Sequence, residues 1–197
     1  MTEVKDGRAD VLSEISKKLS GLSPEELFEK REIIEKKLME FANFMESKTA
    51  LLYSERSSEI PMETIIRRCL EIKKEIVLPS ISNSKHSINL LKINDYDKDL
   101  VKRKLKQNML EPDPGKCKKI SIDQIDIAVI PGLAFDEKGG RLGFGEGFYN
   151  RLIPKLPETT RKISIAFEEQ IAKHIQMDSR KYSVDIIITD KRVIYRI

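Results

Sequence analysis

Apolar residues recur at two different spacings along this chain of 197 residues, and the spacing distinguishes expected helices from expected strands. Within residues 8–19 the apolar positions lie three or four residues apart, which predicts a helix. Ser23-Pro-Glu-Glu26 reads as an N-cap, a first-turn proline and a capping-box glutamate, so it predicts the start of a second helix. This helix is expected to run to about Ser47. Its core side is predicted to consist of Leu27, Ile34, Leu38 and Phe41.

Short apolar runs that end at proline or polar residues predict strands. These runs cover residues 50–53, 75–79, 87–93, 125–131, 162–166, 185–188 and 192–195. Helical or turn patterns separate most of them, at 59–72, from 144 or 146 to about 156, and at 167–175, and Glu111–Gly115 reads as a stiff turn. This alternation indicates a largely parallel sheet covered by helices on both faces. We therefore predict an α/β fold: a three-layer sandwich with a mostly parallel, Rossmann-like sheet and a small antiparallel element, in a single domain spanning residues 1–197.

Composition indicates a soluble globular protein, since 40% of the residues are apolar and 35% are charged. The net charge is only +4 and the charges are interleaved, whereas nucleic-acid binders concentrate basic residues on one stripe. The densest basic stretch, Lys102–Gln107, is interpreted as a solvated face. No apolar run approaches the ~18 residues of a membrane span, and Cys69 and Cys117 lack metal-site spacing. We expect a cytoplasmic monomer or weak homodimer with no nucleic-acid or membrane partner.

Five of the nine glycines lie between positions 139 and 147, directly after a buried-strand pattern. Such a loop leaves backbone N–H groups able to approach an anion, and Arg141 adds positive charge. A helix following the loop is expected to add its positive N-terminal end. The order Gly-x-Gly-x-Gly at 143–147 matches neither the dinucleotide fingerprint nor the P-loop. By composition alone a phosphate cradle and a flexible turn are equally good interpretations.

The order of residues in this region resembles a known family. Pro131-Gly-Leu-Ala-Phe-Asp136, followed by Arg141-Leu-Gly-Phe-Gly-Glu-Gly-Phe-Tyr149, is similar to the signature of the 5-formyltetrahydrofolate cyclo-ligases, also called methenyltetrahydrofolate synthetases. Shorter similarities occur in the same order along nearly the whole chain, at Leu22–Glu26, Glu59–Ile60, Glu111–Pro112 and Ala166–Ile171. The resemblance implies ATP-dependent, magnesium-dependent closure of 5-formyltetrahydrofolate to 5,10-methenyltetrahydrofolate, with release of ADP and phosphate.

The resemblance also implies where the site lies. Arg141 and Tyr149 are predicted to be catalytic, because phosphoryl transfer depends mainly on positioning and charge neutralisation. Ser54, Glu59, Phe144 and Phe148 are predicted to contact the folate substrate. The residues predicted to bind ATP are Arg8, Arg141, Leu142, Gly143, Phe144, Gly145, Glu146, Gly147, Phe148 and Tyr149.

The chain departs from the family pattern at several positions. Asn150 replaces the metal-binding aspartate, so Mg²⁺ is predicted to use Asn150 together with Asp178 or Asp185, although Asp185 is equally well explained as a cap at the start of a strand. Leu12 stands where a second basic residue of the N-terminal helix is expected, and Ser80 stands where an arginine is expected.

These departures leave an alternative open: a divergent paralogue that binds nucleotide or folate without turnover. A nucleic-acid-binding protein, suggested only by the basic stretch and a pI of about 8.9, is the third hypothesis. His86 and His174 have no partners at triad or metal spacing, so both are interpreted as surface histidines.

Overall fold

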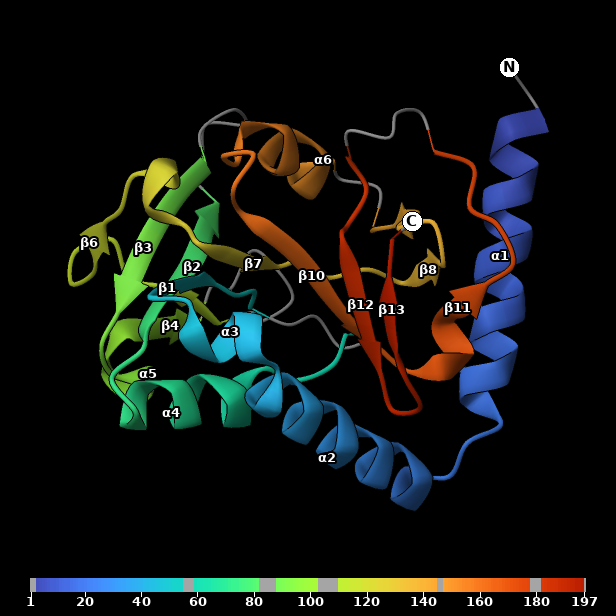
Figure 1. The fold of residues 1–197 in the computed structure, drawn as a ribbon, viewed down its shortest axis with the longest axis horizontal. Coiled ribbons are helices and arrows are strands. Elements are labelled where there is room, and N and C mark those ends of the chain that lie inside the picture. The colour runs from blue at the N-terminus through green and yellow to red at the C-terminus, as the bar shows by residue number, and fades with distance from the viewer. Residues whose placement is uncertain are drawn as a thin grey trace. The chain divides into compact units, whose positions relative to one another are not determined.

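The structure is a computed structural model, and it describes residues 3–54, 59–81, 88–102, 110–144, 147–177 and 182–196 (Figure 1). The chain forms two compact units that alternate along the sequence. The first unit comprises Met1–Phe41, Ile130–Pro154 and Lys162–Ile197, and the second comprises Ala42–Val129 and Lys155–Arg161. No helix within the described ranges is long and apolar enough to cross a membrane.

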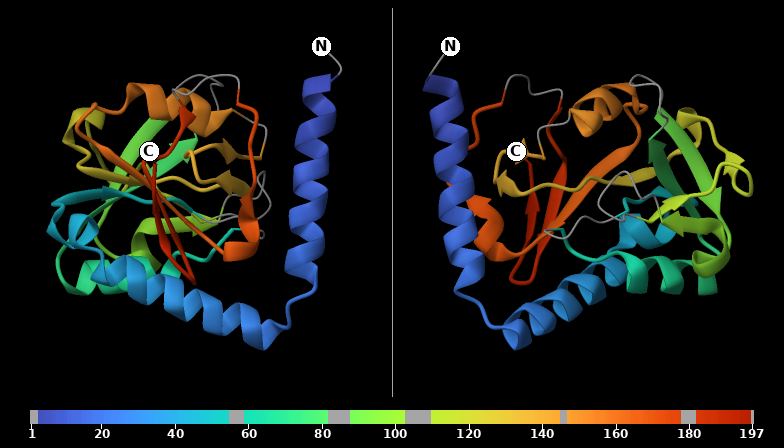
Figure 2. Two further views of the ribbon diagram at one scale, coloured as in Figure 1. Left: turned by 45° about the vertical axis from the view of Figure 1, so that its right-hand side comes forward. Right: turned by 180° about the vertical axis from the view of Figure 1, so that it is seen from behind.

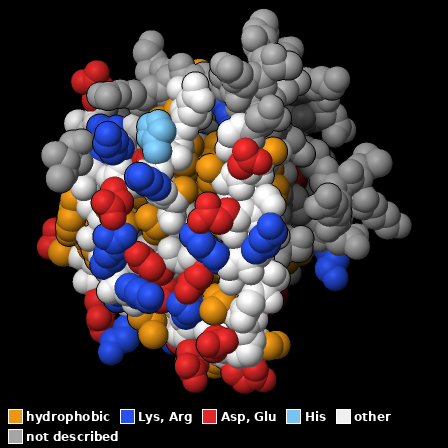
Figure 3. All heavy atoms as spheres, turned by 90° about the vertical axis from the view of Figure 1, so that its right-hand side faces the viewer, with side chains coloured by type: hydrophobic (Ala, Val, Ile, Leu, Met, Phe, Trp, Pro, Cys, Tyr) orange, Lys and Arg blue, Asp and Glu red, His pale blue; other side chains and the backbone are white. Residues whose placement is uncertain are grey.

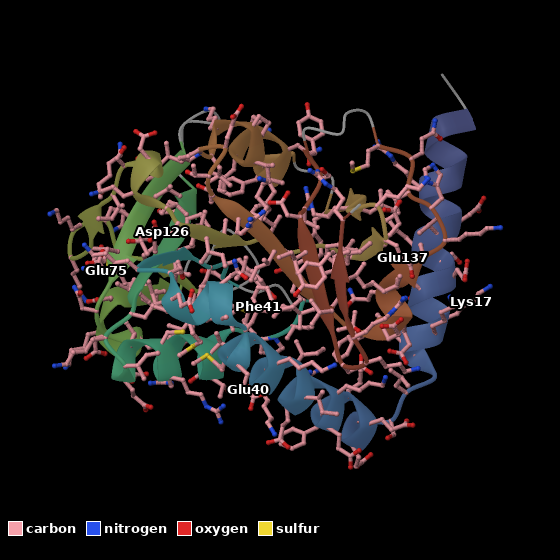
Figure 4. All side chains as sticks on the ribbon, viewed as in Figure 1. Lys17, Glu40, Phe41, Glu75, Asp126 and Glu137 are labelled. Atoms are coloured by element: carbon pink, nitrogen blue, oxygen red, sulfur yellow. The ribbon has the colours of Figure 1, made fainter. Side chains whose placement is uncertain are left out.

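Two long helices begin the first unit, α1 (Glu3–Ser20) and α2 (Pro24–Glu40), joined by a sharp turn at Gly21 (Figure 2). The predicted capping box is confirmed, because Glu26 N donates to Ser23 Oγ (3.1 Å) and Ser23 N donates to the Glu26 carboxylate (2.7 Å). The predicted end at Ser47 is wrong. Phe41 has an extended backbone that ends α2 (Figure 4), and a separate short helix, α3 (Ala42–Glu46), follows in the second unit.

Two sheets lie in the first unit. In one, β10 (Arg161–Ala166) pairs in parallel with β12 (Ile186–Thr189), and β12 pairs antiparallel with β13 (Val193–Tyr195). In the other, β8 (Ala134–Asp136) pairs in parallel with β11 (Ile171–Ala172) and antiparallel with β9 (Arg141–Leu142). The remaining elements are α6 (Phe148–Leu152) and the 3-10 turns η2 (Ile153–Lys155) and η3 (Glu168–Gln170).

An apolar cluster anchors α1 to the small sheet of the first unit. Buried Ile15 forms this cluster together with Ala134, Leu142 and Ile175. Leu12 packs against the same cluster, so an apolar residue at this position stabilises the fold where the family pattern would place a basic side chain. Burying a leucine side chain contributes about 1.5–3 kcal/mol, which gives α1 a packing role in addition to any ligand contact.

In the second unit, the central strand β1 (Thr49–Leu51) pairs in parallel with β2 (Glu75–Ile81) and with β7 (Ile127–Val129). β3 (Ile88–Ile93) pairs antiparallel with β2, and β6 (Lys118–Lys119) pairs antiparallel with β3. Asp126, labelled in Figure 4, accepts hydrogen bonds from the backbone of Lys48 (3.0 Å) and Thr49 (2.8 Å) at the start of β1. The other elements are α4 (Glu63–Glu71), α5 (Tyr96–Asp99), β4 (Leu100–Lys102), β5 (Leu110–Pro112) and η1 (Ile122–Gln124).

Two boundaries in the second unit differ from expectation. β2 does not end at Pro79 but continues to Ile81, because its pairing with β1 ends at Val77 and Pro79 faces only one neighbouring strand, β3. Glu111 and Pro112, predicted to lie in a turn, belong to β5, which pairs with β4.

Parallel strands and helices occur in each unit, and β12 with β13 forms an antiparallel pair, so the predicted α/β class is confirmed.

Ion pairs and hydrogen bonds join two lysines of α2 to the turn between β12 and β13 and to the neighbouring Glu169. Lys30 Nζ lies 2.7 Å from the Asp190 carboxylate and 2.9 Å from that of Glu169, and Lys37 Nζ donates to the backbone oxygens of Thr189 (3.0 Å) and Asp190 (2.8 Å). Burial would lower the pKa of Lys30, but its hydrogen bonds to Asp190 and Glu169 outweigh burial and raise that pKa. Burial likewise tends to raise the pKa of Asp190, yet hydrogen bonds from Lys30 and from the backbone lower it overall.

The neighbouring surface is also charged, because Arg192 lies 2.7 Å from Glu137 and 2.9 Å from Glu168. Acidic and basic side chains are interleaved over the face shown in Figure 3, which agrees with the charge pattern of the sequence.

Asp190→Asn is expected to lower the free energy of unfolding by about 1–3 kcal/mol at pH 7, because it removes a charge-assisted hydrogen bond from a nearly buried site. Since folding lowers the pKa of Asp190, this stabilisation is present above the unfolded value of about 3.9 and is lost as the pH falls through the folded value below it. Thermal midpoints of both proteins should therefore converge as the pH falls below about 4. Glu40→Gln, at an exposed pair 3.9 Å from Lys36, serves as the control and should differ little from the unaltered protein at any pH.

Candidate active site

The glycine-rich segment forms a hairpin where the sequence predicted a loop leading directly into a helix. β8 and β9 pair with Ala134 opposite Leu142 and Phe135 opposite Arg141. The turn between them uses Gly139 at φ +77°, where an added Cβ would lie 2.2 Å from Val184 O, so only glycine fits. The short strands were missed because two or three residues carry too little periodicity to be distinguished from a loop.

The carboxylate of Asp136 holds this turn in place. It is 2% exposed and accepts backbone hydrogen bonds from Lys138 (3.0 Å), Gly140 (2.7 Å) and Ile175 (2.7 Å). An added Cβ at Gly140 would lie 2.6 Å from an Asp136 carboxylate oxygen, which explains the second glycine of the turn. Three donors on one buried carboxylate fix the register of the hairpin and therefore the position of Arg141.

Arg141 is the centre of the candidate site. Its side chain spans two segments, because Nη1 donates to Pro131 O (2.9 Å) and Nη2 donates to Asn150 Oδ1 (2.7 Å). Its backbone N–H donates to Met177 Sδ (3.3 Å), and the residue is only 7% exposed. Arg141 therefore lies in a strand rather than in the loop that the sequence predicted, and pairing with β8 and these contacts bury it.

Two glycines make room for the Arg141 side chain. An added Cβ at Gly143 would lie 2.5 Å from Arg141 Nη1, and one at Gly132 would lie 3.0 Å from Arg141 Cγ and 2.6 Å from the Phe135 ring. A side chain at position 143 would therefore displace the guanidinium, and one at position 132 would displace the Phe135 ring and crowd the stem of Arg141. Both glycines therefore have a steric role, which for Gly143 comes in addition to the anion-binding role predicted from the sequence.

The helix after the glycines is much shorter than expected. It begins at Phe148 rather than at 144 or 146, it has five residues, and it continues as the 3-10 turn η2. Gly147 precedes it in the left-handed region at φ +67°, where other residues are strained. So short a helix does not supply the dipole-based anion site that the sequence suggested.

Of the two aromatic residues at the start of α6, Tyr149 lies beside Arg141 and Phe148 packs against Tyr149. Phe148 and Tyr149 are in edge-to-face contact with their ring centroids 5.0 Å apart. The Tyr149 ring centroid lies 5.8 Å from Arg141 Cζ, within the range of a cation–π contact. Asn150 follows and accepts a hydrogen bond from the guanidinium, so two consecutive residues of α6, Tyr149 and Asn150, contact Arg141.

The predicted site residues have different outcomes. Four of them lie together in the first unit: Arg141, Gly143, Tyr149 and Asn150. Phe148 contacts Tyr149. Leu142 belongs to the apolar cluster that packs against α1. Half-buried Arg8 lies on α1 of the same unit, and Phe144 follows Gly143. Gly145, Glu146 and Asp178 lie outside the described residues, as do His86 and most of the stretch Lys102–Gln107.

Two of the four predicted folate residues, Ser54 and Glu59, lie in the second unit after β1. Between them, residues 55–58 are outside the described part of the chain. The hydroxyl of the neighbouring Tyr53 donates to Ile60 O at 2.9 Å. The side chains of Ser54 and Glu59 are half-buried, and the role of these two residues in substrate binding stays a prediction.

The described residues do not form a set of magnesium ligands. Asn150 Oδ1 accepts a hydrogen bond from Arg141, and an oxygen held by a guanidinium is a poor partner for a second cation. One Asp185 oxygen accepts from Lys162 N (2.9 Å) and lies 3.1 Å from Lys162 Nζ, while the other lies 3.6 Å from Arg196. Within the described ranges, no group of three or more His, Cys, Asp or Glu residues is arranged to hold a metal ion.

Sequence reasoning gave no role to Asp136 or Gln170, although both lie within segments that resemble the family. Asp136 fixes the hairpin turn, and Gln170 contacts the backbone of Gly132 and Leu133. A signal was present in both cases, since each is a polar residue beside an apolar strand pattern. Its meaning depends on contacts with residues up to 39 positions away, which spacing does not reveal.

The geometry defines an α/β protein in which a glycine-rich segment surrounds a buried arginine. The chain is similar to the NMR structure of Aquifex aeolicus 5,10-methenyltetrahydrofolate synthetase, with a TM-score of 0.80 and 26% identity over 95% of this chain and 91% of that one. It also shares its fold with a 5,10-methenyltetrahydrofolate synthetase from Mycoplasma pneumoniae, with a TM-score of 0.69 and 22% identity over 92% and 98% of the two chains.

Sequence comparison gives the same relationship over nearly the full length. A probable 5-formyltetrahydrofolate cyclo-ligase from Caenorhabditis elegans is 27% identical over 202 residues, covering 98% of each chain. One from Schizosaccharomyces pombe is 29% identical over 180 residues, covering 82% of this chain and 84% of that protein. Residues 4–190 match the 5-formyltetrahydrofolate cyclo-ligase family, so the chain belongs to this family.

Proposed function

We propose that this protein closes 5-formyltetrahydrofolate to 5,10-methenyltetrahydrofolate at the expense of ATP. In this reaction the formyl oxygen attacks the γ-phosphate and ADP leaves. The N10 nitrogen then bonds to the activated carbon, and phosphate leaves from it. Family membership over residues 4–190 supports the reaction. The observation that carries the proposal is the buried Arg141 guanidinium, held by Pro131 O and Asn150 Oδ1 within the family's signature segment.

The proposed roles follow from the chemistry of the residues. Phosphoryl transfer develops negative charge on the phosphate oxygens, and a guanidinium held in a fixed orientation neutralises that charge without reorganising. We assign this role to Arg141, and we assign orientation of the guanidinium and stacking on the ligand to Tyr149. The other proposed nucleotide contacts are Arg8, Leu142, Gly143, Phe144, Gly145, Glu146, Gly147 and Phe148. The proposed folate contacts are Ser54, Glu59, Phe144 and Phe148.

Magnesium enters this proposal through the nucleotide. Mg²⁺ retains several waters and commonly binds to substrate phosphates, so the reaction does not require a complete set of protein ligands. Asn150, Asp178 and Asp185 stay predictions as magnesium ligands. In the structure, Asn150 contacts Arg141 and Asp185 contacts Lys162, both of which are cationic. We also propose that the chain acts in the cytoplasm as a monomer or weak homodimer and that residues 1–197 form one domain.

The direct test is absorbance at the band of the methenyl product, with 5-formyltetrahydrofolate, ATP and Mg²⁺ present. An increase that requires both ATP and the protein is the expected result. Binding of ATP or folate by calorimetry without any increase would contradict turnover and would indicate a divergent binding paralogue. Absence of both binding and turnover would contradict the proposal entirely.

A further inference from the structure

Gln170 uses its side-chain amide to join two segments of the first unit. The residue is 4% exposed, and its Oε1 accepts from Phe167 N at 2.9 Å, which closes the turn η3. Its Nε2 donates to Leu133 O (3.1 Å) and lies 3.4 Å from Gly132 O. The Gln170 amide thus accepts from the backbone N–H of Phe167, directly before η3, and its NH₂ group faces the backbone oxygens of Gly132 and Leu133.

The backbone oxygens of the segment Pro131–Leu133 accept hydrogen bonds from Arg141 as well as from Gln170. Pro131 O accepts from Arg141 Nη1 (2.9 Å), and Leu133 N donates to Leu142 O (2.7 Å) beside Arg141. Gly132 lies between these two contacts, and the Phe135 ring and Arg141 Cγ leave no room for a side chain there. A shift of this backbone segment would therefore move the carbonyl that orients the guanidinium.

We propose that Gln170 is a positioning residue for Arg141. Its two donated hydrogen bonds fix the backbone that presents Pro131 O, and Pro131 O fixes one arm of the guanidinium, while Asn150 holds the other arm. Gln170 thus sets the orientation of the cation without touching the ligand. The inference rests on the proposed function, because Arg141 must act on the nucleotide for its orientation to affect nucleotide binding.

The amide chemistry explains why glutamine serves here. A methionine has a similar shape but neither donates nor accepts strongly, so Gln170→Met keeps the volume and removes the contacts. A glutamate keeps the acceptor for Phe167 N but, when ionised, directs a carboxylate oxygen at two carbonyl oxygens. Burial near those carbonyls is expected to raise the pKa of the introduced carboxyl, and its protonation would restore one donor.

The test compares ligand affinities of purified full-length variants by calorimetry. Gln170→Met is expected to weaken ATP binding by about 10-fold while changing 5-formyltetrahydrofolate binding by less than about 2-fold, because the side chain that loses its orientation, Arg141, is assigned to the nucleotide and not to the folate. Thr160→Val is the matched control, since it removes a buried hydrogen bond to Ile125 O (2.6 Å) in the second unit. It should lower the thermal midpoint as much as Gln170→Met and leave ATP affinity unchanged.

Two further measurements separate positioning from a purely structural role. In an Arg141→Ala background, Gln170→Met should not weaken ATP binding further, because coupled residues are non-additive. For Gln170→Glu, ATP affinity relative to the unaltered protein should recover as the pH falls from 8 to 5. This second variant also keeps the test valid if Gln170→Met does not fold.

Multiplicative losses in the double variant, or a lower thermal midpoint with unchanged ATP affinity, would overturn the positioning role alone. No ATP binding by the unaltered protein would overturn the proposed function and this inference together.

Discussion

Arg141→Ala is expected to lower kcat for methenyl product formation by about 1,000-fold or more. Losing a single preorganised donor to a developing anion costs about 10²–10³ in kcat, and losing a cation that acts on a transferring phosphoryl group costs about 10³–10⁵. Arg141 combines both features, because its guanidinium is fixed at two nitrogens before any ligand binds. Stopped-flow or steady-state absorbance at the product band measures the loss directly.

The burial of Arg141 affects the design of this experiment. Since the residue is only 7% exposed and its side chain fills the space beside two glycines, Arg141→Ala is also expected to lower the thermal midpoint. Arg141→Lys therefore accompanies it, because lysine keeps the charge and much of the apolar stem but cannot contact both Pro131 O and Asn150. A loss of at least about 100-fold is expected for this variant too.

The control for both variants is Arg161→Ala, which removes an exposed arginine at the start of β10. It should leave kcat within about 2-fold of the unaltered protein. Turnover that survives Arg141→Lys and Arg141→Ala in folded protein would remove Arg141 from the proposed chemistry. The nucleotide would then have to be held by other parts of the signature segment.

The elements that were predicted well are those with local signals. The start of α2 was found because Ser23, Pro24 and Glu26 each act within one turn of helix. The longest strands, β2, β3, β10 and β12, were found as short apolar runs, and the fold class followed from the alternation of strands and helices. The end of α2 was missed because Phe41 continues the apolar pattern although its backbone is extended.

The site was only partly predictable, for a physical reason. The glycines and Arg141 stand out in the sequence, and their resemblance to the family located the segment. Their geometry depends on non-local partners: Asp136 reaches Ile175, and Gln170 reaches Leu133. These contacts form a hairpin around a buried Arg141 where the sequence predicted a loop, and close packing gives Gly132 and Gly143 a steric role that composition does not indicate.

Asp136→Ala is expected to lower the free energy of unfolding by about 3–5 kcal/mol. The change removes the acceptor of three backbone N–H groups, two of which are buried, and each buried hydrogen bond to a charged group contributes about 1.5–3 kcal/mol. The donors of Gly140 and Ile175 would stay buried without this partner, so solvent compensates little for the loss. The hairpin that carries Arg141 would also lose its register, and ATP affinity should fall together with stability.

Asp113→Ala provides the matched control for this prediction. The Asp113 carboxylate likewise accepts a backbone hydrogen bond, from Gly115 N at 2.9 Å, but it does so in an exposed turn of the second unit. Water replaces that contact, so its loss should cost no more than about 1 kcal/mol. Denaturant unfolding followed by circular dichroism compares the two variants with the unaltered protein. Equal losses from both aspartates would contradict the argument, because burial of the Asp136 donors would then add nothing to the stability of the hairpin.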